Sequence, residues 1–174
     1  MIKKFLTALS FLLILVHTAQ AQVQYEVSTD AKTGLKVLEG VLNADILKND
    51  TSFHWMTDDI SWYKPRPEVL NNLAAVKDSV QIVALIGTWC EDSHYIFPQL
   101  LKMLTQANYD MNNLTILGID RPKVSITPLS KALGLKKTPT IIVFKNGKEV
   151  GRVEEYGKYG IVDQELAEIF AKAK

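Results

Sequence analysis

The chain has 174 residues, and its 20 Lys and Arg residues nearly balance its 19 Asp and Glu residues, giving a formal net charge of +1. This balance, with no basic cluster, argues against nucleic acid or an anionic membrane as a partner. The single cysteine, Cys90, excludes an internal disulfide, so in an oxidising compartment its thiol would be buried, reactive or paired with another molecule.

The first residues predict a cleavable signal peptide over residues 1–21. Lys3 and Lys4 precede an apolar run over residues 5–16, and the run is followed by a small-x-small cleavage site that ends at Ala21. The alternative is a membrane anchor, but the run is shorter than the about 20 residues that a membrane-spanning helix needs. We therefore expect a periplasmic or secreted protein with no stable membrane insertion after cleavage.

Residues 22–64 are expected to form an N-terminal extension that packs on the main domain. The polar and glycine positions around Asp30, Thr33 and Gly34 indicate short extended segments joined by turns. A group of aromatic side chains follows. We expect these to pack against the main domain, with a surface patch for partners as the alternative; they are Phe53, Trp55, Trp62 and Tyr63.

Residues 65–174 begin with the pattern of an α/β domain. Pro67 suits the first turn of a helix. The apolar run that starts at Val80 predicts a central strand buried on both faces. A long helix is expected after Cys90, with Pro98 inside it as a cause of kinking.

The second half of this domain predicts a strand, a short helix, a hairpin and a terminal helix. The strand begins at Leu114, the short helix follows Pro128, and Asn146-Gly147 is the strongest hairpin signal in the chain. The terminal helix has an apolar face, which we expect to point inward; its members are Ile161, Leu166, Ile169 and Phe170. The alternation of strands and helices predicts an α/β fold.

Cys90 stands where the central strand passes into the long helix. Unpaired N–H groups and the helix dipole at this place favour the thiolate, the nucleophilic form, although Glu91 and Asp92 oppose it. His94 lies one helical turn further on and could stabilise the thiolate or accept the thiol proton, and the Ser93 hydroxyl could hydrogen-bond the sulfur. The alternatives are a buried, inert cysteine, a solvated His94 and an ordinary first-turn Ser93.

The stretch around Cys90 resembles the active site of the thioredoxin superfamily, where W-C-x-x-C ends the central strand and opens a helix. Trp89 and Cys90 match the tryptophan and the attacking cysteine, and Pro98 matches the proline inside the helix. Thr138-Pro139 matches the residue and the cis-proline opposite the thiol. More narrowly, the chain resembles bacterial exported thioredoxin-like proteins with W-C-x-D-S. The resemblance implies a three-layer fold, with a central mixed sheet, helices on both faces and the N-terminal extension added.

Two positions depart from the thioredoxin pattern. Ser93 stands where the resolving cysteine would be, so an internal dithiol cycle is not available. Ala84 stands where thioredoxins carry a buried aspartate that helps to deprotonate the second cysteine. The resemblance therefore predicts a monothiol protein.

We expect thiol-disulfide exchange through a mixed disulfide between Cys90 and an exported protein, with release by an external thiol reductant and no cofactor. Trp89, Thr138 and Pro139 would bind the substrate, and Cys90, Ser93 and His94 would act in exchange as an oxidoreductase or isomerase. The alternative is a binding module that grips partner segments at Thr138-Pro139. Metal binding by Cys90, His94 and a carboxylate ranks last, because a zinc site needs three or four protein ligands, and we predict none.

Overall fold

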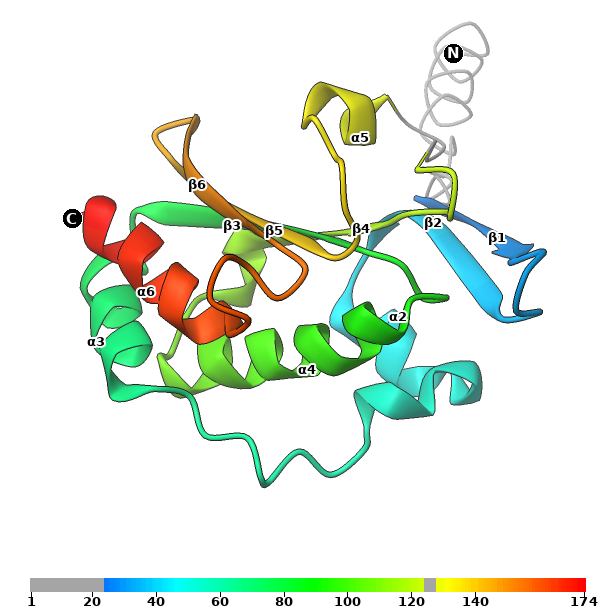
Figure 1. Ribbon diagram of the computed structural model, residues 1–174, viewed down its shortest axis with the longest axis horizontal. Coiled ribbons are helices and arrows are strands. Elements are labelled where there is room, and N and C mark those ends of the chain that lie inside the picture. Colours follow the sequence, from blue (N-terminus) through cyan, green and yellow to red (C-terminus); the bar gives the residue numbers. More distant parts are fainter. Residues whose placement is uncertain (1–23, 124–127) are drawn as a thin grey trace, which may run out of the picture.

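A computed structural model describes residues 24–123 and 128–174 (Figure 1). The predicted signal peptide lies outside these residues. Within them the centre of the molecule is a six-stranded sheet in the order β1-β2-β4-β3-β5-β6. The strands are β1 (Tyr25–Thr29), β2 (Lys36–Leu42), β3 (Val80–Ile86), β4 (Leu114–Gly118), β5 (Thr140–Lys145) and β6 (Lys148–Glu154).

The sheet is mixed, because β3 and β4 are parallel and the other neighbouring strands are antiparallel. β3 lies between β4 and β5, as predicted for a central strand. Only Gln81 of its seven residues is exposed, in keeping with the nearly continuous apolar run. The residues that follow β3, including Cys90, therefore lie at the carboxyl end of a central strand of the sheet.

Helices cover both faces of this sheet, which confirms the predicted layers. Figure 1 shows α3, α4 and α6 below the sheet and α5 above it. The larger buried cluster joins α3, α4 and α6 to one face of the sheet. A smaller buried cluster with Leu85, Leu117 and Ile142 lies on the other face. The helical segments are α2 (Ala44–Asn49), η1 (Thr51–Met56), α3 (Pro67–Val76), α4 (Glu91–Gln106), η2 (Met111–Asn113), α5 (Leu129–Ala132) and α6 (Val162–Lys172).

The predicted hairpin is present between β5 and β6. Asn146 and Gly147 both have positive φ angles, 52° and 72°. A two-residue turn with this geometry favours Asn-Gly, since both residues tolerate the left-handed region better than most. α4 continues through Pro98, which is buried.

The N-terminal extension adds two strands to the central sheet. β2 pairs with β4 antiparallel, with Gly40 opposite Gly118. A Cβ at Gly118 would lie 2.1 Å from the backbone oxygen of Leu38, so the two strands approach too closely for any side chain there. The extension thus shares a backbone ladder with the rest of the chain.

Trp62 packs on the main domain at its surface: it is 56% exposed, unlike its buried neighbours in the extension, and its ring stacks on Tyr95 of α4. One side chain expected to point inward is exposed. Ile161 is 48% exposed, because it precedes the first turn of α6 with extended backbone angles and so does not share that helix's apolar face.

A buried polar contact ties the end of the extension to α6. The Tyr63 hydroxyl donates to Asp163 Oδ1 at 2.6 Å, and the backbone N–H of Arg66 donates to Oδ2 at 3.1 Å. Burial and the adjacent carboxylate raise the pKa of Tyr63 above its usual range, so the hydroxyl remains a donor. This contact fixes the segment between η1 and α3.

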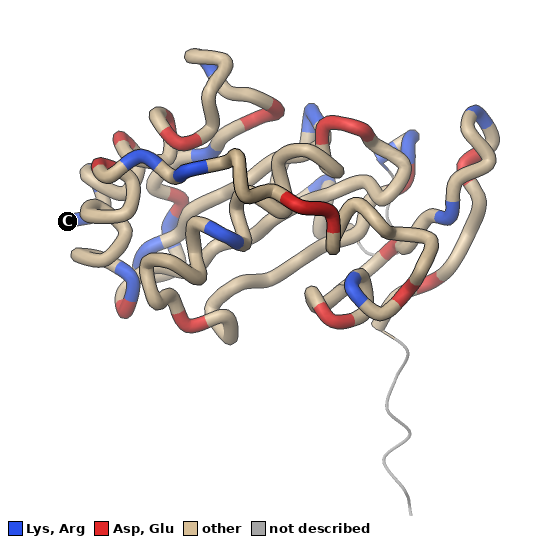
Figure 2. Tube along the Cα trace, turned by 90° about the horizontal axis from the view of Figure 1, so that it is seen from below, with Lys and Arg blue, Asp and Glu red and all other residues tan. Residues whose placement is uncertain are grey.

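In the view from below, acidic and basic residues are both spread over the length of the molecule (Figure 2). Within the described ranges, no helix combines the length and the apolar character that crossing a membrane would need.

Candidate functional site

Cys90 is the N-cap residue of α4 and follows the central strand β3 closely. Its backbone is extended, and no side-chain bond caps the helix there. The thiol is free and partly exposed, and Sγ donates to the backbone oxygen of Thr138 at 3.3 Å. The predicted passage from strand to cysteine to helix is therefore present. The thiol lies next to unpaired N–H groups of the first helical turn.

The Thr138–Pro139 peptide bond is cis, as the resemblance implied, and it lies beside Cys90. The oxygen of Pro139 accepts from the N–H of Glu155 at 2.8 Å, which joins this loop to the end of β6. Thr138 is buried, and its Oγ1 has no hydrogen-bond partner among the described residues. These residues form one wall of the surface around the thiol.

Trp89 is held from two sides. Its Nε1–H donates to the oxygen of Ile119 at 2.8 Å, and the guanidinium of Arg121 lies 4.0 Å from the ring centroid. Arg121 in turn makes a bidentate pair with Asp30, at 2.7 and 2.9 Å. The extension thereby holds the arginine that covers Trp89.

The pair of Asp30 and Arg121 keeps both of these groups ionised near the thiol. Hydrogen bonds from Arg121 and Thr33 hold the pKa of Asp30 well below its usual range. The Asp30 carboxylate raises the pKa of Arg121, and Arg121 also interacts electrostatically with Cys90. A permanent positive charge is therefore within electrostatic reach of the sulfur. Sequence reasoning missed both residues, because 91 positions separate them and no local pattern links them.

Ser93 is completely buried and bonded to backbone. Its Oγ accepts from the N–H of Gly87 at 3.1 Å. This bond closes the turn between β3 and α4 and does not involve the sulfur. A Cβ on Gly87 would lie 2.8 Å from the Trp89 ring, so this turn is tightly packed around the tryptophan. A role for Ser93 in exchange stays a prediction.

His94 faces the extension. Its Nε2 lies 2.7 Å from the oxygen of Thr88, and because a carbonyl only accepts, Nε2 carries the hydrogen. The ring stacks on Trp55 with centroids 4.5 Å apart and an interplanar angle of 16°. Burial lowers the pKa of His94 below its usual value. A neutral imidazole leaves Nδ1 as an acceptor, and a catalytic role for it stays a prediction.

Thr88 connects this histidine to the extension. Its hydroxyl donates to the oxygen of Lys36 at 3.0 Å and accepts from the N–H of Leu38 at 3.1 Å, both in β2. The structure therefore gathers Trp89, Cys90, Thr138 and Pro139 around the thiol and turns Ser93 and His94 toward backbone partners.

Ala84 is fully buried in β3, at the position where the resemblance places an aspartate. Around the site and through the rest of the described chain, no three His, Cys, Asp or Glu side chains are placed to hold a metal ion.

A known protein resembles this chain over part of its length. No known protein-family model matches the sequence. A protein of Alternaria alternata named "Thioredoxin AMT13" is 32% identical over 83 residues, which cover 48% of this chain and 65% of that protein. The chain thus spans less than two thirds of the relative that it matches.

Solved structures of thioredoxins are also similar. Thioredoxin f2 of Chlamydomonas reinhardtii has 20% identity and a TM-score of 0.39, covering 52% of this chain and 76% of that one. A thioredoxin pre-protein of Schistosoma mansoni has 22% identity and a TM-score of 0.38, covering 64% and 95%. The sheet order, the helices on both faces and the cis-proline beside the cysteine describe a thioredoxin-like α/β fold.

Proposed function

We propose that the protein exchanges disulfides with other proteins through Cys90 as a single thiol. The observation that carries the proposal is the placement of a partly exposed cysteine at the start of α4, 3.3 Å from the backbone of the Thr138–Pro139 loop. The thiol and the cis-proline loop lie side by side there, and we infer that a peptide segment of a partner binds at this loop while Cys90 acts as the nucleophile.

The reaction has two balanced steps. The Cys90 thiolate attacks one sulfur of a partner disulfide, a new S–S bond forms, and the partner's other sulfur leaves as a thiolate. An external thiolate then attacks the partner sulfur and releases Cys90 as a thiolate. In the isomerase version of this step, the attacking thiolate belongs to a third cysteine of the partner, so that a new disulfide pairing is left in the partner. Cys90 begins and ends the cycle as a thiolate, so it is neither oxidised nor reduced overall.

Ser93 and Ala84, the two positions that differ from the thioredoxin pattern, both support a cycle that depends on a thiol from another molecule. Ser93 is buried and holds the backbone of Gly87, and Ala84 offers no proton acceptor. A mixed disulfide at Cys90 has no resolving thiol within this chain. It therefore lasts until a second molecule supplies one.

The second candidate is a binding module in which Cys90 is idle. The observation that favours it is the orientation of the two polar neighbours. Ser93 and His94 are hydrogen-bonded to the backbone of Gly87 and Thr88, and neither of these bonds involves the sulfur. The groove at Thr138–Pro139 would then bind partner segments without chemistry.

A peptide carrying one cysteine as a mixed disulfide with a chromogenic thiol separates the two. We expect the protein to release the chromophore and to form a covalent adduct with the peptide at Cys90, seen by mass spectrometry and removed by glutathione. The reference is a free peptide of residues 86–96, which has the same local sequence without the fold. Cys90→Ser is the blank. If the folded protein reacts no faster than the free peptide, the binding module replaces this proposal.

Export is the second part of the proposal. The charged start, apolar run and Ala21 site support cleavage of a signal peptide, so partners would be periplasmic or secreted proteins. Mass spectrometry of protein recovered from its native compartment should find an N-terminus at or near Gln22. A retained Met1 would contradict export by cleavage.

A further inference from the structure

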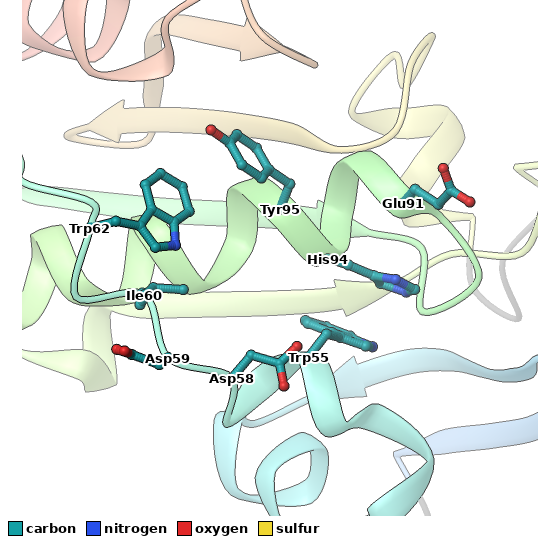
Figure 3. Close-up of a pocket in the computed structure, with 8 residues that line it drawn as sticks. All are labelled: Trp55, Asp58, Asp59, Ile60, Trp62, Glu91, His94 and Tyr95. Atoms are coloured by element: carbon teal, nitrogen blue, oxygen red, sulfur yellow. The ribbon is translucent and has the colours of Figure 1, made fainter.

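An open cavity of about 430 Å³ lies between the extension and α4, next to the helix turn that follows Cys90. This volume is in the range of sites that bind small ligands or single side chains. Figure 3 shows the segment around Trp55–Trp62 on one side and the first turns of α4 on the other. The lining residues are Trp55, Asp58, Asp59, Ile60, Trp62, Glu91, His94 and Tyr95.

The walls of the cavity are aromatic. Trp62 and Tyr95 stack with centroids 5.5 Å apart, and both rings are about half exposed. On the other side Trp55 stacks on His94 and is only 6% exposed, so the accessible ring surface of the cavity comes from Trp62 and Tyr95. Ring faces of tryptophan and tyrosine attract cations, most strongly those of tryptophan. The walls thus favour a flat, cationic group over a neutral one.

The charged groups of the lining are all acidic. Asp58, Asp59 and Glu91 line the cavity, and the lining includes neither lysine nor arginine. Hydrogen bonds from Ser61 lower the pKa of Asp59, which keeps it ionised. Lys64 and Lys102 interact electrostatically with Asp59 from outside the lining.

The nearby positive charges offset the three carboxylates only in part. Lys102 Nζ donates to the oxygen of Ile60 at 2.7 Å and acts on Asp59 together with Lys64, so two positive charges stand against three negative ones. Asp58 lies 3.6 Å from His54 Nδ1, and the side chains of both are largely exposed. Burial keeps His94 in its neutral form near pH 7. The cavity therefore presents a net negative charge between aromatic walls.

A row of rings leads from this cavity toward the thiol loop. Tyr95 contacts Tyr156 with centroids 6.0 Å apart, and the Tyr156 hydroxyl donates to Asp92 Oδ1 at 2.9 Å. Tyr156 follows Glu155, whose N–H is bonded to Pro139. The ring contacts from Trp62 through Tyr95 to Tyr156 thus run from the cavity to the residue that follows Glu155, beside the Thr138–Pro139 loop.

We propose that this cavity binds the side chain of an arginine in the partner protein, next to the segment held at the thiol loop. A guanidinium is planar, stacks on aromatic rings and pairs with carboxylates, and it is less strongly hydrated than an ammonium group. The site rests on the shape and charge of the cavity. It does not require that Cys90 react.

The test uses the thiol-free variant Cys90→Ser and two cysteine-free peptides of glycine and serine around one central residue. That residue is arginine in one peptide and citrulline, its neutral isostere, in the other. Titration followed by calorimetry should give a dissociation constant on the order of tenfold lower for the arginine peptide, since one ring contact and one exposed ion pair together supply about that factor.

Two matched double variants locate the site. Asp58→Asn with Asp59→Asn should remove the preference for arginine, and asparagine at position 59 can still accept from Ser61. Glu26→Gln with Asp45→Asn changes the net charge equally at exposed positions in β1 and α2 and should leave the preference intact. Equal binding of the two peptides, or equal loss in both double variants, would overturn the inference.

A further comparison tests the commitment to a protein segment. Arginine amide alone should bind more weakly than the arginine peptide. Equal affinity would show that the cavity binds a small cationic molecule and does not recognise a protein segment. Exchange is measured separately, with the wild type and disulfide peptides. Preferential arginine binding without adduct formation would refute the proposed function and leave this site standing.

Discussion

Removal of one hydroxyl at the end of the extension should weaken the whole fold. Tyr63→Phe deletes the donor that bonds Asp163 Oδ1 at 2.6 Å and leaves the aromatic ring in place. Tyr63 and Asp163 are only 8% and 4% exposed, so water cannot readily replace the lost bond. Hydrogen bonds to charged groups contribute about 1.5–3 kcal/mol, and an unsatisfied buried acceptor adds cost in the same range.

We therefore expect Tyr63→Phe to lower the free energy of unfolding by about 2 kcal/mol, with the backbone N–H of Arg66 still bonded to Oδ2. For a chain of this size the midpoint of thermal unfolding should fall by roughly 4–8 °C. Urea unfolding followed by tryptophan fluorescence measures the change, and an unaltered slope would show that the denatured state is the same.

The matched control is Tyr25→Phe, because Tyr25 is only partly buried and its hydroxyl makes no hydrogen bond within the described part of the chain. The control should change stability by less than about 0.5 kcal/mol. If the two variants unfold at the same urea concentration, the contact between the extension and α6 does not contribute to stability and the reasoning fails.

Three further changes test the site and the sheet. Ser93→Cys restores the C-x-x-C spacing and should give weak insulin reduction with a chemical thiol as electron source, and adding Ala84→Asp should increase it; activity no higher than that of a Cys90→Ala protein would contradict the proposed exchange. His94 has a lowered pKa, so the unfolded chain binds its proton first and stability should fall as the pH drops below about 6.5. His94→Phe should show a shallower fall between pH 7 and 5 in urea titrations, and an identical fall would assign the effect to other groups. Gly118→Ala should destabilise the fold by about 1–3 kcal/mol, since its Cβ would overlap the oxygen of Leu38, and an unchanged urea midpoint would contradict the close approach of β2 and β4.

Local patterns were sufficient for most helices and strands from residue 65 onward. Pro67 is the first residue of α3, the run from Val80 is β3, and Asn146-Gly147 forms the turn of the last hairpin. Each of these depends on neighbours in sequence, such as a proline at a helix start or two residues that tolerate positive φ. The resemblance then supplied what no local pattern gives, the cis bond before Pro139 and its position beside Cys90.

The surroundings of the thiol depend on contacts that the sequence does not reveal. The pairing of Asp30 with Arg121 and the stacking of His94 on Trp55 both need the extension to be placed against the sheet. The same placement decides that Trp62 packs at the surface of α4, whereas Phe53, Trp55 and Tyr63 are buried. Aromatic composition indicated a cluster; it could not indicate which ring would be outermost.

The position of β2 beside β4 has a consequence for the order in which the chain folds. β2 is made before β3 and α4, yet its neighbour on the inner side of the sheet is β4, and the bond between Asp30 and Arg121 spans 91 positions. Contacts between residues so far apart close a large loop and slow the folding reaction. A chain still emerging from the ribosome already carries Cys90 before Arg121 has been made and can cover Trp89. The nascent protein therefore passes through a stage in which the Cys90 thiol is exposed and the contacts around it have not yet formed. At this stage it can react with any oxidant or thiol in its environment.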